Sequence, residues 1–234
     1  MESKYLIEVV VDSLEAAILA EAAGADRLEL CAALETGGLT PGMGLIKGVC
    51  DRVSIPVFVL IRTRSGDFTC TDYEFETLLL EAEVAREAGA QGIVAGILQP
   101  DGRIDAQRMS LLCQAASPLP VTFHRAFDRA RDRDEAVQDL ISSGCKRLLS
   151  SGMTSTAFEG RHTLRFLREK LEGKVEVMPG GGINSNNVTE IAGVSGASEF
   201  HFSGIQQVTG KGWTPVPEKV NEINQALEGW FSES

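Results

Sequence analysis

Short apolar runs rich in β-branched residues alternate with longer amphipathic segments from one end of the chain to the other. Such short runs are typical of buried strands, whereas the longer segments, such as those that begin at Ser13 and Asp72, have the apolar spacing of helices. Ser13 and Asp72 also belong to the residue types that cap helix N-termini. The predicted strands lie at 5–11, 26–32, 55–62, 92–98, 120–126, 147–151, 175–180 and 198–203.

Eight strands that alternate with helices predict an α/β fold, a (β/α)8 TIM barrel, with a single domain over residues 1–234. The second choice is an open doubly wound sheet, which the strand count and the lack of an early GxGxxG motif disfavour. A glycine suited to the left-handed end of a helix precedes strands two, four, six and eight, and this recurrence indicates an internal βα repeat. These glycines are Gly24, Gly89, Gly144 and Gly196.

Side chains alternate between the two faces of a strand, so one parity of each strand faces the barrel interior. The residues predicted to face inward are Glu8, Val10, Asp12, Arg27, Glu29, Cys31, Arg62, Thr122, His124, Glu176, Met178, Glu199 and His201. An unpaired buried charge costs several kcal/mol, so we expect these carboxylates to be paired with arginines or histidines. Low on the strands, at Glu8, Arg27 and Glu176, a structural ion-pair network is favoured. Residues at carboxyl ends, where barrel active sites lie, favour function.

The loop after the third strand carries Arg62, Arg64 and Asp67 beside a glycine. Arginine forks match the oxygens of carboxylates and phosphates in pairs, so Arg62 and Arg64 are candidates for clamping an anion. A salt-bridged loop that only closes the barrel mouth is the alternative.

His124, Arg125 and Asp128 stand close together at the end of the fifth strand. His124 is suited to general acid or base catalysis near neutral pH, with Asp128 orienting it or holding Arg125. A buried histidine with a structural role is the alternative. We predict the following roles: catalytic for Arg62, His124, Asp128, Glu199 and His201, and ligand-binding for Glu29, Arg64, Asp67 and Arg125.

Glycine-rich turns follow the seventh and eighth strands, whose loops often bind phosphate in barrels. Gly180, Gly181 and Gly182 would expose backbone N–H groups, and Ser151 and Gly152 after the sixth strand would extend the same anion cradle. A tight turn that needs positive φ angles is the other interpretation of the glycines.

The composition of the chain limits the classes of partner and the cellular location that we expect for it. Lysine and arginine number 22 against 33 acidic residues, a net charge of −11 that would repel nucleic acid. The N-terminus lacks the pattern of a secretory signal, and no stretch has the length of a membrane span. Five cysteines without CxxC spacing argue against a disulfide framework or zinc cluster and fit a reducing cytosol.

Metal ligands are sparse in the predicted interior. Two inward histidines and several carboxylates permit a divalent site, although no HxH or HExxH spacing supports one. Cys31 and Met178 are the only inward pair with the soft sulfur ligands that Cu(I) prefers. Each is also a common inert core residue.

Several segments together resemble the CutC family of copper-homeostasis proteins, from about Ile7 to Gly204. They are IEVVVDSLEAA, GADRLELCAALETGGLTPGMGLI, IPVFVLIRTRSGDF, PLPVTFHRAFD, SSGMTSTAFEG, MPGGGI and EFHFSG. The resemblance implies a (β/α)8 barrel, a cytoplasmic location, homo-oligomers such as dimers or tetramers, and Cu(I) binding with Cys31 as a ligand. In this chain Val10 stands where the family usually has a second inward cysteine, and one thiolate alone holds Cu(I) poorly.

Three hypotheses follow. The first is a cytosolic protein that binds Cu(I) through Cys31. The second is a barrel enzyme, an isomerase, epimerase or lyase, or a sensor, for a small phosphorylated or carboxylated metabolite. A lysine-dependent aldolase is disfavoured because no lysine stands inside a strand. The third treats the polar interior as ion-pair scaffolding alone.

Overall fold

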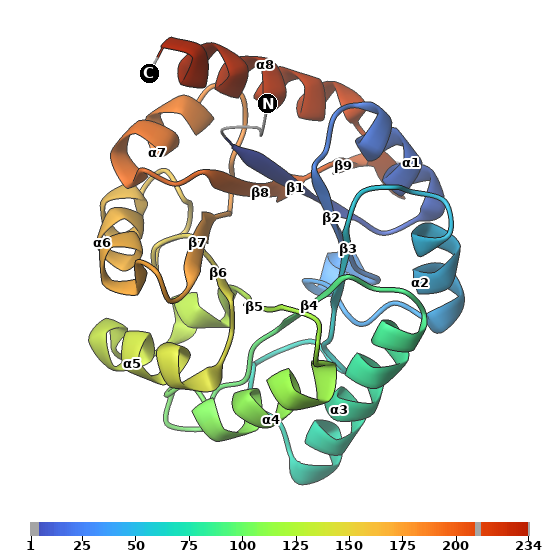
Figure 1. Ribbon diagram of the computed structural model, residues 1–234, viewed down its shortest axis with the longest axis vertical. Helices are drawn as coiled ribbons and strands as arrows, with labels where there is room; N and C mark the ends of the chain where they lie inside the picture. The colour runs from blue at the N-terminus through green and yellow to red at the C-terminus, as the bar shows by residue number, and fades with distance from the viewer. Residues whose placement is uncertain (1–4, 209–211, 234) are drawn as a thin grey trace.

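Eight parallel strands close into a barrel in the computed structural model, which describes residues 5–208 and 212–233 (Figure 1). The barrel strands are β1 (Leu6–Val11), β2 (Arg27–Leu30), β3 (Val57–Leu60), β4 (Gly92–Ala95), β5 (Val121–Phe123), β6 (Arg147–Ser150), β7 (Glu176–Pro179) and β8 (Glu199–Ser203). Neighbouring strands pair in sequence order, and β1 also pairs with β8. A parallel bridge between Gly180 and His201 joins the ends of β7 and β8. The predicted (β/α)8 barrel is confirmed, and the open doubly wound sheet is wrong.

Helices surround the barrel as an outer ring (Figure 1). The ring consists of α1 (Leu14–Ala22), α2 (Met43–Cys50), α3 (Asp72–Glu87), α4 (Ala106–Ala116), α5 (Arg133–Ser143), α6 (Arg161–Leu171), α7 (Val188–Ser195) and α8 (Pro217–Glu233). The shorter elements are the 3-10 helices η1 (Leu34–Thr36) and η2 (Arg125–Arg129) and the hairpin of β9 (Ile205–Val208) and β10 (Gly212–Pro215). The sequence left the packing of the C-terminal segment open, and the structure places α8 between α7 and α1, where it completes the ring.

Strand parity divides the apolar core into two clusters, as predicted. The large cluster lies between strands and helices and contains Ile7, Val9 and Leu28. A small cluster fills the barrel interior and consists of Val10, Cys31, Phe58, Leu60 and Val94. Val10 and Cys31 therefore both face inward, and several charged side chains share the interior with them.

Local turn chemistry explains where the helices begin and end. Ser13 caps α1 and accepts a hydrogen bond from the Ala16 backbone N–H, as expected. The predicted cap at Asp72 is wrong by one residue, because the Thr71 hydroxyl caps α3 in a reciprocal capping box with Glu74. The four recurring glycines all have positive φ, at 93°, 103°, 84° and 69° along the chain, so the helix-terminating role predicted for them is confirmed.

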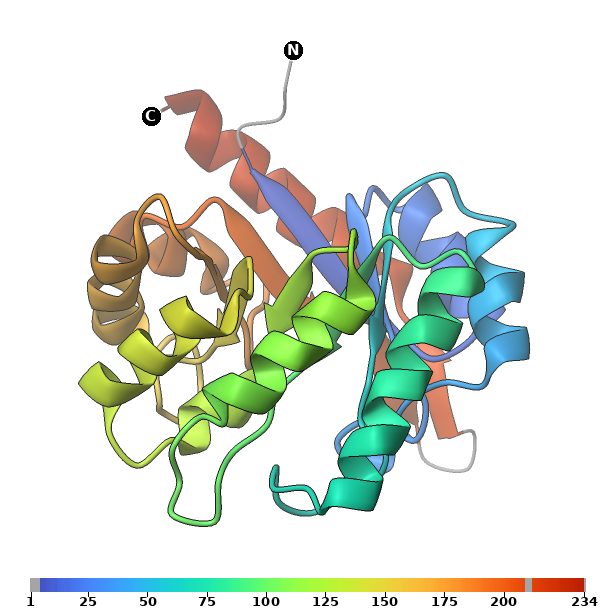
Figure 2. The same cartoon turned by 60° about the horizontal axis from the view of Figure 1, so that its bottom comes forward.

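The two ends of the barrel differ in chemistry. Figure 2 shows the carboxyl ends of the strands meeting the long loops after β3 and β4 at the lower edge, whereas β1 begins at the opposite face. We call the carboxyl end the mouth and the amino end the floor. Among the described residues, no helix combines the length and apolarity needed to cross a bilayer.

Candidate ligand site at the barrel mouth

A network of ion pairs fills the floor of the barrel. The Arg27 guanidinium contacts Glu8 through Nε and Glu199 through Nη2, the latter at 2.6 Å, and Arg147 donates to both Glu199 oxygens at 2.5 and 3.0 Å. Both guanidinium groups also lie over the Phe58 ring, 4.9 and 5.5 Å from its centroid. The expected pairing of inward carboxylates is thus confirmed for Glu8 and Glu199. Arg147 is a partner that was not predicted.

Glu199 belongs to this floor and lines neither of the two mouth cavities described below. Burial would raise the pKa of its carboxyl, but Arg147 and Arg27 overcome that effect and lower it. The carboxylate is therefore a fixed anion between two cations. The structure gives it a pairing role and does not bring it together with the other predicted catalytic residues. Glu176, which parity also placed inside, is exposed at the amino end of β7.

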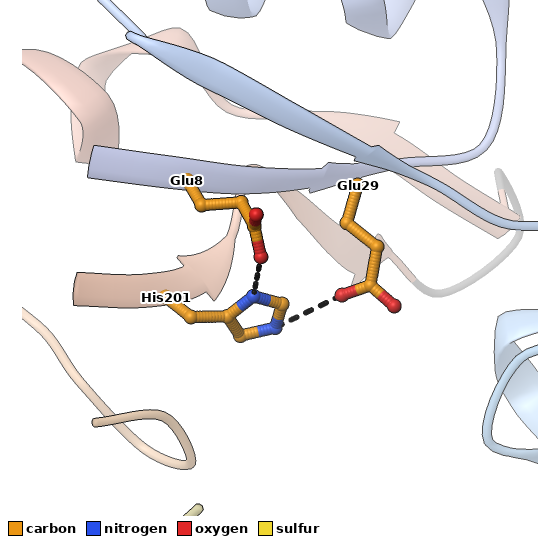
Figure 3. A group of neighbouring side chains, drawn as sticks. All are labelled: Glu8, Glu29 and His201. Carbon is orange, nitrogen blue, oxygen red and sulfur yellow. Dashed lines mark hydrogen bonds and ion pairs between the residues drawn. The ribbon is translucent and has the colours of Figure 1, made fainter. Parts of the chain in front are cut away.

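Above the floor, His201 bridges two buried glutamates (Figure 3). Its Nδ1 lies 2.8 Å from Glu8 Oε1 and its Nε2 lies 3.4 Å from Glu29 Oε2. Despite burial, the two carboxylates raise the pKa of His201. Glu8, with Arg27 and His201 as partners, has its pKa lowered to about 2. We call Glu8, His201 and Glu29 the mouth triad.

Glu29 is a member of the triad that titrates near neutral pH. Burial raises its pKa to about 7, against the lowering effect of His201, and the Glu8 charge raises it further. The Cys31 thiol donates to Glu29 Oε1 over 3.7 Å. A carboxyl with a pKa near neutrality is suited both to accept and to donate a proton at physiological pH.

A cavity of about 160 Å³ lies above the triad at the centre of the mouth. Polar side chains that line it come from five elements or the loops that follow them: Glu29, Cys31, Arg62, His124, Arg125 and His201. A larger cavity of about 520 Å³ adjoins it and shares Val10, Arg125 and His201 with it. The two together form one site at the end of the barrel where enzymes of this fold bind ligands.

Arg62 reaches the central cavity as a cation without a carboxylate partner. Its guanidinium donates to the carbonyl oxygens of Gly37, Gly38 and Gly66 at 3.2, 3.2 and 3.0 Å, and it forms no ion pair with a described residue. It also lies over the Phe68 ring, 4.9 Å from the centroid. Burial and the neighbouring Arg64 charge lower its pKa. The nearby Asp67 charge raises it in part. The site therefore contains a fixed positive charge that has no ion pair among the described residues.

Arg64 and Asp67 lie outside the central cavity, although Asp67 lines a neighbouring cavity together with Arg62 and Arg125. Arg64 and Asp67 pair with each other at 2.8 Å on the exposed side of the loop, and Arg64 also binds Glu74 of α3 at 2.6 Å. Neither lines the central cavity. The alternative of a salt-bridged loop describes this pair, so the two-arginine clamp is reduced to Arg62. The sequence could not separate these two arginines, because loop direction beyond a strand has no fixed period.

His124 is buried beside Arg62 with one nitrogen already used. Its Nδ1 accepts a hydrogen bond from the Ala126 backbone N–H at 3.2 Å, so the neutral ring carries its proton on Nε2. Burial lowers its pKa to about 4, and the Arg62 charge adds to that effect. At neutral pH the ring is therefore an uncharged donor that lines the central cavity.

Asp128 holds Arg125 and does not touch His124. Its carboxylate accepts from Arg125 Nε at 2.9 Å, from the Ser150 hydroxyl at 2.6 Å and from the backbone N–H groups of Ser151 and Met153. Although Asp128 belongs to η2, its carboxylate thus lies against the loop after β6 and takes the hydrogen bonds that an external anion would otherwise accept. Arg125 Nη2 donates to Ser151 Oγ, which leaves Nη1 without a partner among the described residues.

Fewer backbone N–H groups are available to bind an anion than the predicted cradle requires. Ser151 N–H is taken by Asp128, Gly152 N–H donates to Ser150 Oγ, and Gly180 N–H donates to the Ser150 carbonyl. The N–H groups of Gly181 and Gly182 donate to no acceptor within the described chain, and both residues line the larger cavity. They have φ of 109° and 74°, so the tight-turn interpretation also holds for them.

Two glycines, Gly96 and Gly181, pack closely against side chains of the site. A Cβ atom on Gly96 would lie 2.4 Å from the His124 ring, and one on Gly181 would lie 3.1 Å from the Arg125 guanidinium. Real Cβ atoms essentially never approach within 3.0 Å, so a side chain at Gly96 would displace the imidazole.

Comparison with known proteins identifies the family. The model of the CutC family matches residues 5–206. The chain belongs to the CutC family. It is 47% identical over 199 residues to the human copper homeostasis protein cutC homolog, covering 85% of this chain and 73% of that protein. It is 44% identical to the family protein CutC of Histophilus somni, covering 84% and 81%.

Solved structures agree with this placement. The putative copper homeostasis protein CutC from Streptococcus agalactiae superposes with a TM-score of 0.80 at 30% identity, over 84% of this chain and 97% of that one. A thiamine phosphate pyrophosphorylase from Pyrococcus furiosus has a TM-score of 0.65 at 17% identity, over 97% of each chain, and shares the fold alone.

The donor set around Cys31 fits Cu(I) poorly in this CutC-family barrel. Burial and the Glu29 charge raise the pKa of its thiol well above the ordinary value, whereas Cu(I) binds thiolates. The second inward sulfur, Met178 Sδ, accepts from Arg27 Nη2 at 3.2 Å in the floor network. The remaining neighbours are the carboxylates and imidazole of the mouth triad, which suit harder cations.

Proposed function

We propose that this CutC-family barrel binds a small carboxylated or phosphorylated metabolite at its mouth and moves a proton on it. The observation that carries the proposal is Arg62, a half-buried guanidinium fixed by three carbonyl oxygens and left without a carboxylate partner beside a cavity. A cation that has no ion-pair partner in a partly desolvated site attracts an anion strongly. Arg125 Nη1 supplies a second donor across the same cavity.

The neighbouring groups supply acid–base chemistry. Glu29, with a pKa of about 7, can remove a proton from a carbon next to a carbonyl group. The neutral His124 would donate its Nε2 hydrogen to the carbonyl oxygen as negative charge develops there. Return of the proton from Glu29 to a neighbouring carbon gives an isomerase. Delivery of a proton to the opposite face by a second acid gives an epimerase, and loss of a leaving group gives a lyase.

Glu8 and His201 serve this reaction by positioning. The Glu8 carboxylate is wholly buried and fixes the imidazole through Nδ1, so that Nε2 faces Glu29 (Figure 3). Asp128 likewise positions Arg125 through an ion pair. The predicted catalytic role of His124 and the predicted ligand-binding role of Arg125 thus stay in this proposal. Arg62, predicted as catalytic, is assigned to ligand binding, and Glu29, predicted as ligand-binding, is assigned the role of the base. His201 and Asp128, predicted as catalytic, become supporting residues.

A thermal-shift screen against carboxylated and phosphorylated metabolites tests the proposal, since a selective ligand raises the unfolding temperature by mass action. For any ligand found, we expect the protein in D2O to exchange a carbon-bound hydrogen for deuterium, as measured by NMR. Glu29→Gln should still bind the ligand but lose the exchange at least roughly 100-fold, because it removes the base. Failure of every anion to stabilise the protein, or undiminished exchange in Glu29→Gln, would count against the proposal.

Copper handling is the second candidate function, because relatives of this chain carry the name copper homeostasis protein. The first hypothesis placed Cu(I) on Cys31. The raised thiol pKa and the lack of an available second sulfur beside it argue for another place in the chain. A Cu(I) titration of Cys31→Ser separates the two: unchanged affinity would exclude Cys31 from the copper site.

A homo-oligomer is the partner that we propose, with a second copy of this chain on the outer face of α3. Tyr73, Leu80 and Val84 follow one face of this helix, and Tyr73 and Leu80 are 82% and 62% exposed. Light scattering of the wild type and of Leu80→Lys tests this contact; a dimer or tetramer that persists in the variant would refute it. A cytosolic location stays a proposal, supported by five cysteines that are all free.

A further inference from the structure

The central cavity of the mouth is too small to hold a whole metabolite. Its volume is about 160 Å³, below the roughly 300–1,000 Å³ of ordinary small-molecule pockets, whereas the adjoining cavity of about 520 Å³ falls inside that range. Val10, Arg125 and His201 line both cavities, so one ligand can occupy the two together. A ligand whose reacting carbons lie beside Glu29 therefore extends into the larger cavity, and the lining of that cavity selects the group that it carries there.

Hydrogen-bond donors without an acceptor gather in the larger cavity. The backbone N–H groups of Gly181 and Gly182 donate to no acceptor within the described chain. Arg125 Nη1 also has no partner among the described residues, and it packs against Gly181, where a Cβ atom would lie 3.1 Å from it. The guanidinium and the glycine backbone thus lie side by side in the same lining.

Lys219 brings a further positive charge to this cavity. It lies in the first turn of α8, is half-buried and forms no ion pair with a described residue. Glu222 is the one acidic residue among those that line the cavity, and its Oε2 accepts a hydrogen bond from the Ser185 hydroxyl at 3.2 Å. The cavity therefore offers an ammonium, one end of a guanidinium and two peptide N–H groups to an anion, against a single carboxylate.

We infer that the ligand of the mouth is a small carboxylic acid that also carries a phosphate ester, with the phosphate in the larger cavity and the carboxylate at Arg62. The inference rests on the function proposed for the mouth and narrows its ligand to molecules with two anionic groups. A phosphate presents three strong acceptor oxygens and a charge of roughly −1.5 to −2 at pH 7, which suits several separate donors. A carboxylate has two oxygens in one plane and would leave some of these donors unused.

The neighbouring cavity on the other side of the mouth suits a phosphate less well. It has a volume of about 860 Å³ and is lined by Arg129, but Asp67 and Asp128 line it too. Two carboxylates repel a dianion more strongly than one does. Arg129 is therefore the matched control for Lys219, because each is a cation without an ion pair to a described residue and each lines a different neighbour of the central cavity.

Calorimetric titration with phosphoglycolate, and with glycolate as the same acid without its phosphate, tests the inference at constant ionic strength. We expect the wild type to bind phosphoglycolate at least roughly 100-fold more tightly than glycolate. Lys219→Met should weaken phosphoglycolate at least about 10-fold and glycolate less than about threefold, and Arg129→Met should change neither by more than about threefold. Equal affinity for the two acids, wild-type affinity for phosphoglycolate in Lys219→Met, or a loss in Arg129→Met instead would overturn the inference.

A second measurement reports on the site without any substitution. In isotopically labelled wild type at constant ionic strength, inorganic phosphate should shift the amide NMR resonances of Gly181 and Gly182. It should leave in place the resonance of Gly66, which lines the neighbouring cavity. Unmoved resonances at both Gly181 and Gly182 would also overturn the inference.

The phosphate site and the proton transfer proposed for the mouth fail on different results. If phosphate does not bind but a purely carboxylated ligand undergoes Glu29-dependent exchange in D2O, the proposed function stands and the phosphate site is wrong. If phosphate binds through Lys219 and no phosphorylated acid undergoes exchange, the phosphate site stands and the proton transfer is wrong.

Discussion

Replacement of Arg62 by alanine is expected to abolish most of the stabilisation that an anionic ligand gives to the protein. A charge-assisted hydrogen bond contributes about 1.5–3 kcal/mol, and a bidentate contact adds to it, so we expect affinity to fall about 100-fold. The free protein should lose little stability, because Arg62 forms hydrogen bonds to carbonyls and no ion pair with a described residue. Thermal shift and calorimetric titration with the ligand from the screen measure both effects.

Arg64→Ala is the matched control, since it removes the same side chain two residues away. Arg64 pairs with Asp67 and Glu74 and does not line the central cavity. Ligand affinity should therefore change less than about threefold, as is usual when an exposed ion pair is removed. Equal losses in the two variants would mean that general charge, and not the fixed Arg62 guanidinium, attracts the ligand.

Glu8→Gln is expected to cause the largest loss of stability in the chain. Glu8 is wholly buried and accepts from Arg27 and His201, so the amide would leave charged donors underneath the mouth without their anion. Breaking a buried ion pair by removing one partner costs about 3–5 kcal/mol. The unfolding temperature should fall by about 10 °C for a chain of this size. Chemical denaturation at pH 7 measures the free-energy difference.

The pH dependence gives this result a second signature. The folded protein holds the pKa of Glu8 at about 2, below its ordinary value of 4.5, so its stabilising contribution is complete above pH 4.5 and is lost as pH falls toward 2. The stability difference between wild type and variant should shrink over that interval. Glu176→Gln, an exposed carboxyl on the same floor, should leave stability nearly unchanged. A similar loss in both variants would contradict the role of burial.

Strand parity predicted the interior of this barrel well, because side chains on a strand alternate without exception while the pairing is regular. Glu8, Glu29, Cys31 and His201 lie inward for that reason. Glu176 follows the same parity and lies opposite Arg147, but it is the first residue of its strand, so its side chain remains exposed to solvent. Arg147 followed the parity of β6 and would have been found by counting that strand as the others were counted.

Residues beyond the strand ends could not be placed from sequence. Arg62 and Arg64 have the same charge and spacing parity, yet one enters the cavity and the other binds the outside of the loop. The loop after β6 carried the expected pattern of an anion cradle, but Asp128 already satisfies it. Hydrogen-bond competition between distant segments decides such cases, and a linear pattern does not record it.

The close approach of Gly96 to the His124 ring changes how natural variants of this protein should be interpreted. A methyl group at that position alters no charge, no hydrogen-bonding group and no predicted contact with a ligand, and substitution tables rank the exchange as mild. It would nevertheless push the imidazole out of register with the mouth. A substitution of Gly96 is therefore expected to impair the site as much as a substitution of one of its acidic or basic residues.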